Sequence, residues 1–250
     1  MNLSLDLNAD LGEGAEHDAE LLGLVTSASI ACGFHAGDSA MMRTSLEAAR
    51  DANVAVGAHP GFNDREHFGR RELPLNDEEI FALVADQVRA FDVLAKSLSM
   101  QPQHVKPHGA LYNMAARDEA IADAIVRAVV AVDSRLMLFA PCASALSRAA
   151  QNHGLRVACE VFADRNYLAD GSLVPRSRPD ALLHDPGEGA QRVFRMLSEG
   201  VVRSVEGTDV HVRADTVCIH GDSPDAVEFA QNLRLRLSQS GVVIAAPNEK

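Results

Sequence analysis

Short apolar runs recur along the whole chain, and most of them end in a cluster of polar side chains capable of chemistry. Their length and flanking turn residues favour β-strands over helices. Strands are predicted over Leu3–Leu5, Ser27–Ala31, Val54–Gly57, His104–Lys106, Leu136–Phe139, Arg156–Val161 and Thr216–Ile219. Polar groups at the same end of successive parallel strands converge in space, so the pattern predicts one functional site at the C-terminal face of a βα fold.

Between these strands the apolar positions follow helical spacing. Helices are predicted over Asp18–Val25, Ser39–Asp51, Asn76–Leu98, Asp118–Val132, Ala143–His153 and Pro224–Ser240. Ser39 is the expected N-cap of its helix, and Asn76 is expected to cap the long third helix together with Glu79. Residues 62–75 and 164–186 are long, follow strands that carry candidate residues, and are predicted to be lids or substrate walls.

Strands and helices that alternate along one chain form a closed barrel or a doubly wound sheet. The barrel is favoured here because polar clusters follow nearly every strand, whereas a doubly wound sheet gathers its site at one switch point. The predicted fold is α/β, an irregular seven-stranded (β/α) TIM-like barrel. A hairpin is expected over Val201–Arg213 and a last apolar run over Val242–Ala246. No linker or repeat divides residues 1–250, which are predicted to be a single domain.

Composition narrows the class of protein further. The chain has 250 residues, 47% of them hydrophobic, and a formal net charge of −12. Such an acidic chain is not expected to bind nucleic acid, which requires a basic surface. No apolar run approaches ~18 residues and no signal-peptide pattern is present, so neither a membrane span nor export is expected. Cys32, Cys142, Cys159 and Cys218 lack CxxC spacing, and those in strand-like runs are expected to be buried, reduced thiols in a cytoplasmic protein.

The candidate catalytic residues lie in the polar clusters at the strand ends. Asp6, Asn8 and Asp10 alternate, so Asp6 and Asn8 share one face of a strand. A carboxylate inside a barrel requires a metal, a lysine or a substrate cation as its partner. Lys106 can neutralise a carboxylate or a phosphoryl oxygen, and His108 can move a proton near neutral pH. The full candidate catalytic set is Asp6, Asn8, Asp10, His35, Asp38, His59, Lys106, His108, Glu160 and His220.

Loop residues supply the candidate substrate contacts. Arg70, Asp164 and Arg165 are assigned to substrate binding, although an Asp-Arg pair in a loop often only fastens that loop. Cys32 is expected to be a packed thiol rather than a nucleophile, because no dedicated base adjoins it. No Gly-x-x-x-x-Gly-Lys-Ser/Thr motif occurs, so any ATP is bound without a P-loop.

Taken together, the motifs resemble those of the LamB/YcsF family along essentially the whole chain and in the same order. The segments that carry the resemblance are Asp6–Glu13, Ala31–Asp38, Gly57–Pro60, Phe68–Arg71, Lys106–Tyr112, Glu160–Arg165 and His220–Asp222. The family's fold is similar to the irregular barrel of the glycoside hydrolase/deacetylase superfamily, which agrees with the barrel expected above.

The resemblance also implies an activity. LamB/YcsF proteins are the A subunit of 5-oxoprolinase, a hydrolase that opens the cyclic amide 5-oxoproline to glutamate. The implied co-substrate is ATP, accompanied by Mg²⁺, and the implied partners are 5-oxoprolinase subunits B and C. In this interpretation Lys106 and Arg70 stabilise phosphoryl or oxyanion charge.

Two alternatives remain open at this point. A metal-dependent deacylase acting without ATP would hold zinc or a similar ion with Asp6, His35 and His59, or with His220, since histidine and carboxylate ligands suit a catalytic metal. A non-catalytic partner would only bind substrate or scaffold a complex, but the density of ionisable residues at the strand ends argues against it.

Overall fold

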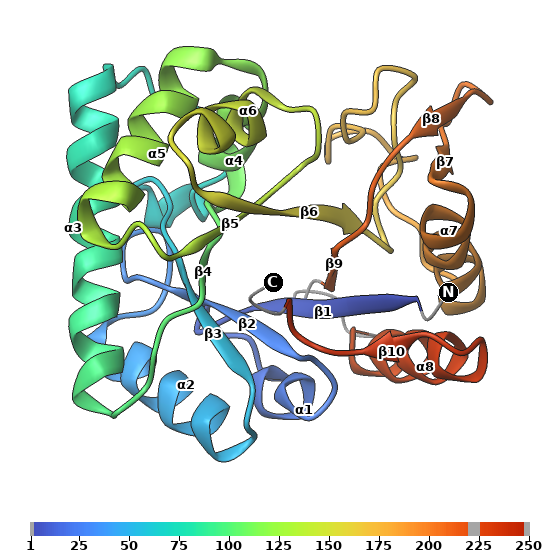
Figure 1. Ribbon diagram of the computed structural model, residues 1–250, viewed down its shortest axis with the longest axis horizontal. Coiled ribbons are helices and arrows are strands. Elements are labelled where there is room, and N and C mark those ends of the chain that lie inside the picture. Colours follow the sequence, from blue (N-terminus) through green and yellow to red (C-terminus); the bar gives the residue numbers. More distant parts are fainter. Residues whose placement is uncertain (1–2, 220–225, 248–250) are drawn as a thin grey trace.

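The computed structural model describes residues 3–219 and 226–247, and within them parallel strands close into a barrel (Figure 1). Its seven strands are β1 (Ser4–Leu11), β2 (Ser27–Ala31), β3 (Ala55–His59), β4 (His104–Val105), β5 (Met137–Ala140), β6 (Arg156–Phe162) and β9 (Thr216–Ile219). They follow one another around the barrel in that order, and β9 pairs with β1 to close it. The predicted seven-stranded barrel is therefore confirmed.

The first strand is longer than expected, and this changes the position of three candidate residues. The sequence predicted an apolar strand over Leu3–Leu5 that runs on through Asp6 and Asn8 into a loop, but all three polar residues, including Asp10, lie within β1. The alternate positions are apolar and buried in the outer core, among them Leu5 and Leu7. Because successive side chains of a strand point to opposite faces, the three polar side chains point into the barrel.

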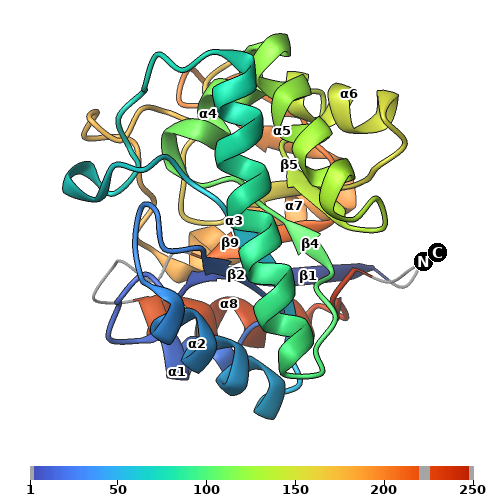
Figure 2. The same cartoon turned by 90° about the vertical axis from the view of Figure 1, so that its left-hand side faces the viewer.

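Helices cover the outside of the barrel (Figures 1 and 2). They are α1 (Asp18–Leu22), α2 (Ser39–Asp51), α3 (Asp77–Ser97), α4 (Gly109–Arg117), α5 (Glu119–Val132), α6 (Ala145–Asn152), α7 (Pro186–Glu199) and α8 (Ala226–Gln239). The capping box of Asn76 and Glu79 at α3 is confirmed. Ser39 is not the N-cap of α2, because the side chain of Asp38 accepts the hydrogen bond from the Met41 backbone N–H.

Two of these helices were not expected from the sequence. The first, α4, begins at Gly109, after the short segment that follows β4. The second, α7, has Asp185 as N-cap, Pro186 in its first turn and Gly200 in a left-handed conformation at its C-terminus. These are standard helix boundaries. Gly187 near the start of α7 has a low helix propensity, so the apolar spacing of this segment did not indicate a helix.

The remaining elements lie outside the barrel wall. The expected hairpin is formed by β7 (Val201–Arg203) and β8 (Asp209–His211), which pair antiparallel. The final apolar run gives β10 (Val243–Ile244), which pairs with the start of β1. A short 3₁₀ helix, η1 (Arg65–His67), lies in the first long loop. No helix among the described residues is long and apolar enough to span a bilayer.

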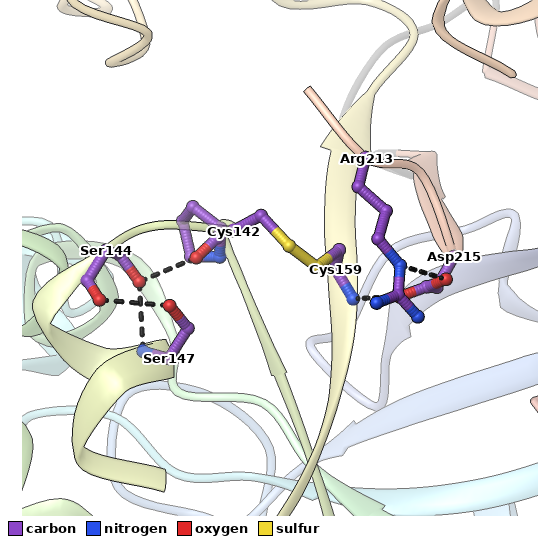
Figure 3. Close-up of a disulfide and its surroundings, with 7 residues drawn as sticks. Cys142, Ser144, Ser147, Cys159, Arg213 and Asp215 are labelled. Atoms are coloured by element: carbon purple, nitrogen blue, oxygen red, sulfur yellow. Dashed lines mark hydrogen bonds and ion pairs between the residues drawn. A yellow bond between two sulfur atoms is a disulfide. The ribbon is translucent and has the colours of Figure 1, made fainter. Parts of the chain in front are cut away.

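The cysteines only partly match the expectation. Cys32 and Cys218 are free and buried, as expected. Cys159, however, is bonded to Cys142 (Figure 3). Cys159 is paired in register with Ala140 at the end of β5, which brings it beside the loop that carries Cys142. The two Cα atoms are 5.0 Å apart, a separation that disulfides commonly span.

The inside of the barrel divides into an apolar layer and a polar layer. Met137, Phe139 and Ala158 form a small cluster, and the His104 ring stacks on Phe139 with the ring centroids 4.0 Å apart. Barrel interiors are usually filled by branched apolar side chains. Here the C-terminal part of the barrel holds ionisable groups instead, so this end of the barrel contains the candidate site.

Candidate active site

Asp6 lies deepest in the polar layer, and both of its carboxylate oxygens accept hydrogen bonds. Its carboxylate accepts hydrogen bonds from the hydroxyls of Thr26, Ser27 and Thr216 at 2.6, 2.8 and 2.5 Å. Burial raises the pKa of Asp6 to about 6, although the three hydroxyl donors act in the opposite direction. Asp6 therefore lies below the mouth of the barrel rather than at the strand end expected from the sequence.

The raised pKa of Asp6 predicts a pH-dependent stability. The folded chain keeps the Asp6 proton up to about pH 6, whereas the unfolded chain releases it near pH 4. The unfolded state thus binds fewer protons between these values, and the free energy of unfolding falls by up to about 3 kcal/mol as the pH rises through this window. Asp6→Asn removes this contribution. Urea unfolding at pH 4 and pH 6.5 of both proteins measures it, and an equal pH dependence in the two would contradict the prediction.

Lys106 is the buried cation at the centre of the polar layer. Its Nζ lies 2.6 Å from Asp10 Oδ1 and 2.9 Å from Glu160 Oε1. It also donates to Asn8 Oδ1 at 2.9 Å and contacts Cys218 Sγ at 3.2 Å. Burial by itself lowers the pKa of Lys106, but the neighbouring negative groups, first of all the Asp10 carboxylate, more than offset it and hold the pKa well above the usual value. Lys106 is therefore a charged group already shared between two carboxylates.

Glu160 is held on both oxygens. Its Oε2 accepts a hydrogen bond of 2.6 Å from the Tyr112 hydroxyl, and its Oε1 accepts one of 3.1 Å from Asn8 Nδ2. The same Asn8 nitrogen donates to Thr216 Oγ1 at 2.7 Å, which connects this group to the Asp6 layer. With Lys106 also on Oε1, Glu160 is a fixed structural carboxylate that orients its neighbours.

Three histidines and one glutamate form a second group, nearer the solvent. His35, His59, His108 and Glu13 each offer one potential ligand atom, and these atoms all lie within 4.8 Å of one another. Glu13 Oε1 is 3.1 Å from both His35 Nε2 and His108 Nδ1 and 3.6 Å from His59 Nε2. The His35 and His108 rings stack with centroids 3.9 Å apart. We call these four residues the histidine group.

The two groups are in contact through Asp10. Its Oδ1 meets Lys106, and its Oδ2 lies 3.4 Å from His59 Nε2. Burial lowers the pKa of His35 to about 4, so its ring is neutral at pH 7. Burial also opposes protonation of His59, but the Asp10 and Glu13 carboxylates outweigh it and raise the pKa of His59. The polar layer is thus one continuous chain of contacts from Asp6 to the mouth.

Loop residues hold the histidine group in place. Arg65 in η1 donates from its guanidinium to the carbonyl oxygens of Gly33 and Gly37, which flank His35. The Phe68 ring lies edge-on to His35 and His108, with centroids 5.9 and 5.4 Å away. The long loop after β3 therefore packs on the loop after β2 and forms one wall of the site, as expected from the sequence.

Gly61 is a position where even a methyl group would disturb the site. A Cβ at residue 61 would lie 2.5 Å from His35 Nδ1. The backbone cannot move away, because the Gly61 N–H and carbonyl are both hydrogen-bonded to the Gln87 side chain. Gly61→Ala is therefore expected to displace His35 and lower turnover by roughly 10²-fold, the usual effect of a misplacement of about 1 Å. Gly23→Ala, where the added Cβ meets only an ordinary contact, is the control. Steady-state kinetics gives the turnover number of each variant. Equal turnover numbers for Gly61→Ala and Gly23→Ala would contradict the prediction.

Most candidate residues are brought together, but some are not. The structure joins Asn8, Asp10, His35, His59, Lys106, His108 and Glu160 in the contacts described above. Asp38 is exposed and serves as the N-cap of α2, so it does not enter the site. His220 lies outside the described residues.

The candidate substrate-binding residues lie in the long loops. Arg70 is exposed, and its guanidinium lies over the Phe68 ring at 5.0 Å from the centroid. Arg165 is buried and donates to the Val174 carbonyl oxygen at 2.7 Å, so it fastens the loop between β6 and α7. Asp164, the neighbour of Arg165, is half-buried in the same loop. The contacts of Arg165 therefore match the alternative considered from the sequence, in which the residue only fastens its own loop.

Sequence reasoning missed two residues of the site. Glu13 was not among the candidate catalytic residues and appeared only at the end of the segment Asp6–Glu13 that carries the family resemblance. Its signal was a carboxylate just past the end of β1, between Gly12 and Gly14, which both have positive φ and turn the chain over the mouth. Tyr112 follows His108 by four residues on the first turn of α4, so both can face the same side.

A parallel barrel with a cluster of ionisable side chains at the C-terminal ends of its strands is the arrangement found in βα-barrel enzymes. The sequence model of the LamB/YcsF family matches residues 5–250. The chain belongs to the LamB/YcsF family.

Relatives and solved structures agree with this assignment. The chain is 50% identical over 244 residues to the A subunit of 5-oxoprolinase from Erwinia tasmaniensis, covering 98% of this chain and 100% of the relative. It is 48% identical over 251 residues to the A subunit of 5-oxoprolinase from Bacillus subtilis, covering 98% of each. The crystal structure of a lactam utilization protein from Thermus thermophilus superposes with a TM-score of 0.92 at 44% identity, over 98% of this chain and 100% of that one.

A more distant structure supports the fold alone. A polysaccharide deacetylase from Bacillus cereus, 13% identical, matches with a TM-score of 0.53 over 99% of this chain and 93% of its own. The expected likeness to the deacetylase type of barrel is thus confirmed.

Proposed function

We propose that this chain is the A subunit of an ATP-dependent 5-oxoprolinase, which hydrolyses 5-oxoproline to glutamate together with subunits B and C. The observation that carries the proposal is the identity of about half of all residues, over nearly the full length, to proteins named as the A subunit of 5-oxoprolinase. The name of the Thermus thermophilus protein, which refers to lactam utilization, supports the same class of substrate.

The proposed reaction needs ATP because the five-membered lactam is an amide that resists direct attack by water. The lactam carbonyl oxygen attacks the γ-phosphorus of ATP, and ADP leaves. Water then adds to the activated carbon, and the carbon–nitrogen bond breaks with a proton passing to the ring nitrogen, which leaves the phosphoryl group on the new carboxyl as an acyl phosphate. A second water hydrolyses this acyl phosphate and releases inorganic phosphate. The products are glutamate, ADP and phosphate.

We place the reaction in the cytoplasm, where ATP is supplied, although a disulfide is uncommon in that compartment.

The polar layer suggests a division of labour for this chemistry. The histidine group, which lies at the mouth of the barrel, holds the attacking water. Asp10, which contacts both Lys106 and His59, receives a proton from it. Lys106 keeps Asp10 charged and in place instead of meeting the phosphoryl group itself, because its charge is already shared with Glu160. Arg70, exposed on the loop that packs on the histidine group, contacts the phosphoryl oxygens of ATP with Mg²⁺.

Glutamate production from 5-oxoproline tests the proposal directly. The assay compares this chain alone, and with subunits B and C, each with and without ATP and Mg²⁺. Glutamate is expected only when ATP and both partner subunits are present. Rapid ring opening by the isolated chain without ATP would overturn the proposal.

The histidine group favours one second candidate, a metal-dependent deacylase that acts without ATP. Three histidines and a carboxylate close together suit a catalytic metal. This candidate differs from the sequence-based hypothesis in its ligands, because the Asp6 carboxylate accepts from three hydroxyls and is not part of the group. ATP-independent hydrolysis that a chelator abolishes would support it.

A further inference from the structure

The tautomers of two histidines follow from their backbone partners. His59 Nδ1 lies 2.7 Å from the Lys106 carbonyl oxygen, and His108 Nε2 lies 2.9 Å from the Phe68 carbonyl oxygen. A carbonyl oxygen only accepts hydrogen bonds, so each of these nitrogens carries the ring proton. The other nitrogens, His59 Nε2 and His108 Nδ1, therefore present lone pairs when the rings are neutral, and both point to the centre of the histidine group.

These two lone pairs face each other at short range. His59 Nε2 and His108 Nδ1 are 2.9 Å apart, which suits a hydrogen bond only if a proton lies between them. The Glu13 carboxylate adds negative charge at 3.1 Å from the His108 nitrogen. His35 Nε2 approaches the same carboxylate oxygen at 3.1 Å, and its buried Nδ1 has no hydrogen-bond partner among the described residues. The centre of the group thus gathers nitrogen lone pairs and a carboxylate oxygen around one point.

We propose that Glu13, His35, His59 and His108 form a binding site for one divalent transition-metal ion of the Zn²⁺ and Co²⁺ class. Imidazole nitrogens with one carboxylate are the ligands this class prefers. Two ligands bound at about 2.1 Å to one ion lie ~3.0–3.4 Å apart, depending on the angle between them. Three of the separations in the group, 2.9, 3.1 and 3.1 Å, fall at or beside this range.

The surroundings resemble those of a metal centre in a second respect. Metal-binding histidines usually donate their other ring N–H to a backbone carbonyl or a carboxylate, which fixes the tautomer. His59 and His108 both do so. A single shared proton would bridge only these two rings, whereas the four side chains come from the ends of four successive strands and meet around one point. A metal ion can accept a lone pair from each of the four, once the most widely separated ligand atoms close by a few tenths of an ångström from their spread of up to 4.8 Å.

The test measures metal binding by the full chain without substrate, ATP or partner subunits. After dialysis against a chelator, the protein is titrated with Co²⁺ and followed by its visible absorption, and Zn²⁺ is measured by competition and elemental analysis. We expect about one ion per chain and a rise in the melting temperature on binding. Glu13→Gln and His108→Asn are each expected to weaken binding by at least ~100-fold, more than the loss of an outer-shell partner.

His153→Ala is the matched control. His153 lies at the C-terminal end of α6, where it pairs with Asp123 on the outside of the barrel and has no contact with the histidine group. The variant is expected to bind like the unaltered chain. Chemical denaturation of each metal-free variant verifies folding, and the partly exposed Glu13 is the ligand whose replacement disturbs packing least. Substoichiometric binding by the unaltered chain, or unchanged affinity in Glu13→Gln, would overturn the site. ATP-dependent glutamate production by a metal-free enzyme would then leave the proposed function standing.

Discussion

Replacing Lys106 with methionine is expected to lower the free energy of unfolding by about 3–5 kcal/mol, the usual cost of removing one partner from a buried ion pair. The Lys106 ammonium is buried between Asp10 and Glu160, at 2.6 and 2.9 Å. Without it, two carboxylates remain in the barrel with no compensating charge. Urea denaturation at pH 7 measures the loss.

Two further variants separate charge from packing. Lys106→Met combined with Glu160→Gln removes a buried negative charge as well, and is expected to regain part of the lost stability. Lys96→Met is the surface control, since Lys96 forms an i,i+4 pair with Asp92 and is 42% exposed. Its expected cost is below about 1 kcal/mol. Equal losses from Lys106→Met and Lys96→Met would show that the buried charges do not depend on Lys106.

His108→Asn is expected to lower 5-oxoproline-dependent ATP hydrolysis of the assembled enzyme by about 10²–10⁴-fold, the range typical for a group that handles protons or water at the reacting centre. His108 contacts both His59 and Glu13 through one ring nitrogen, so its loss opens the middle of the histidine group. Initial rates at saturating ATP, with assembly checked by size-exclusion chromatography, give the result.

His104→Asn provides the matched control for His108→Asn. His104 is equally buried, but it hydrogen-bonds Ser29 and stacks on Phe139 in the apolar layer below the site. We expect a similar loss of stability from both variants and a large loss of turnover only from His108→Asn. Comparable turnover in the two would remove His108 from the reacting centre.

Local patterns predicted the barrel because each strand and helix carries its own period, length and boundary residues. The capping box at Asn76 and the hairpin after Val201 are examples in which neighbouring residues alone determine the structure. Elements with conflicting local signals were less predictable. The helix that starts at Pro186 has clear boundary residues, but its glycines obscure the helical period.

The candidate site shows the same division. Residues at strand ends could be identified because parallel strands bring their C-terminal ends to one face. The assignment of Asp38 was less successful, since its side chain satisfies a helix N-terminus three residues away instead of the site. Glu13 was missed because its role depends on the turn after β1, which brings its carboxylate next to the ends of three other strands and their loops.

By itself, the sequence determined the class of fold, the end of the barrel that holds the site and the membership of the LamB/YcsF family. Only the tertiary structure decided which polar groups pair with one another. The sequence predicted that Lys106 is a cation available to substrate. In the structure its ammonium instead forms ion pairs with Asp10 and Glu160, which are distant along the chain. Ion pairs, tautomers and shifted pKa values depend on burial and on distances of a few ångströms between separate strands. No local pattern encodes these distances, because they arise only when the barrel closes.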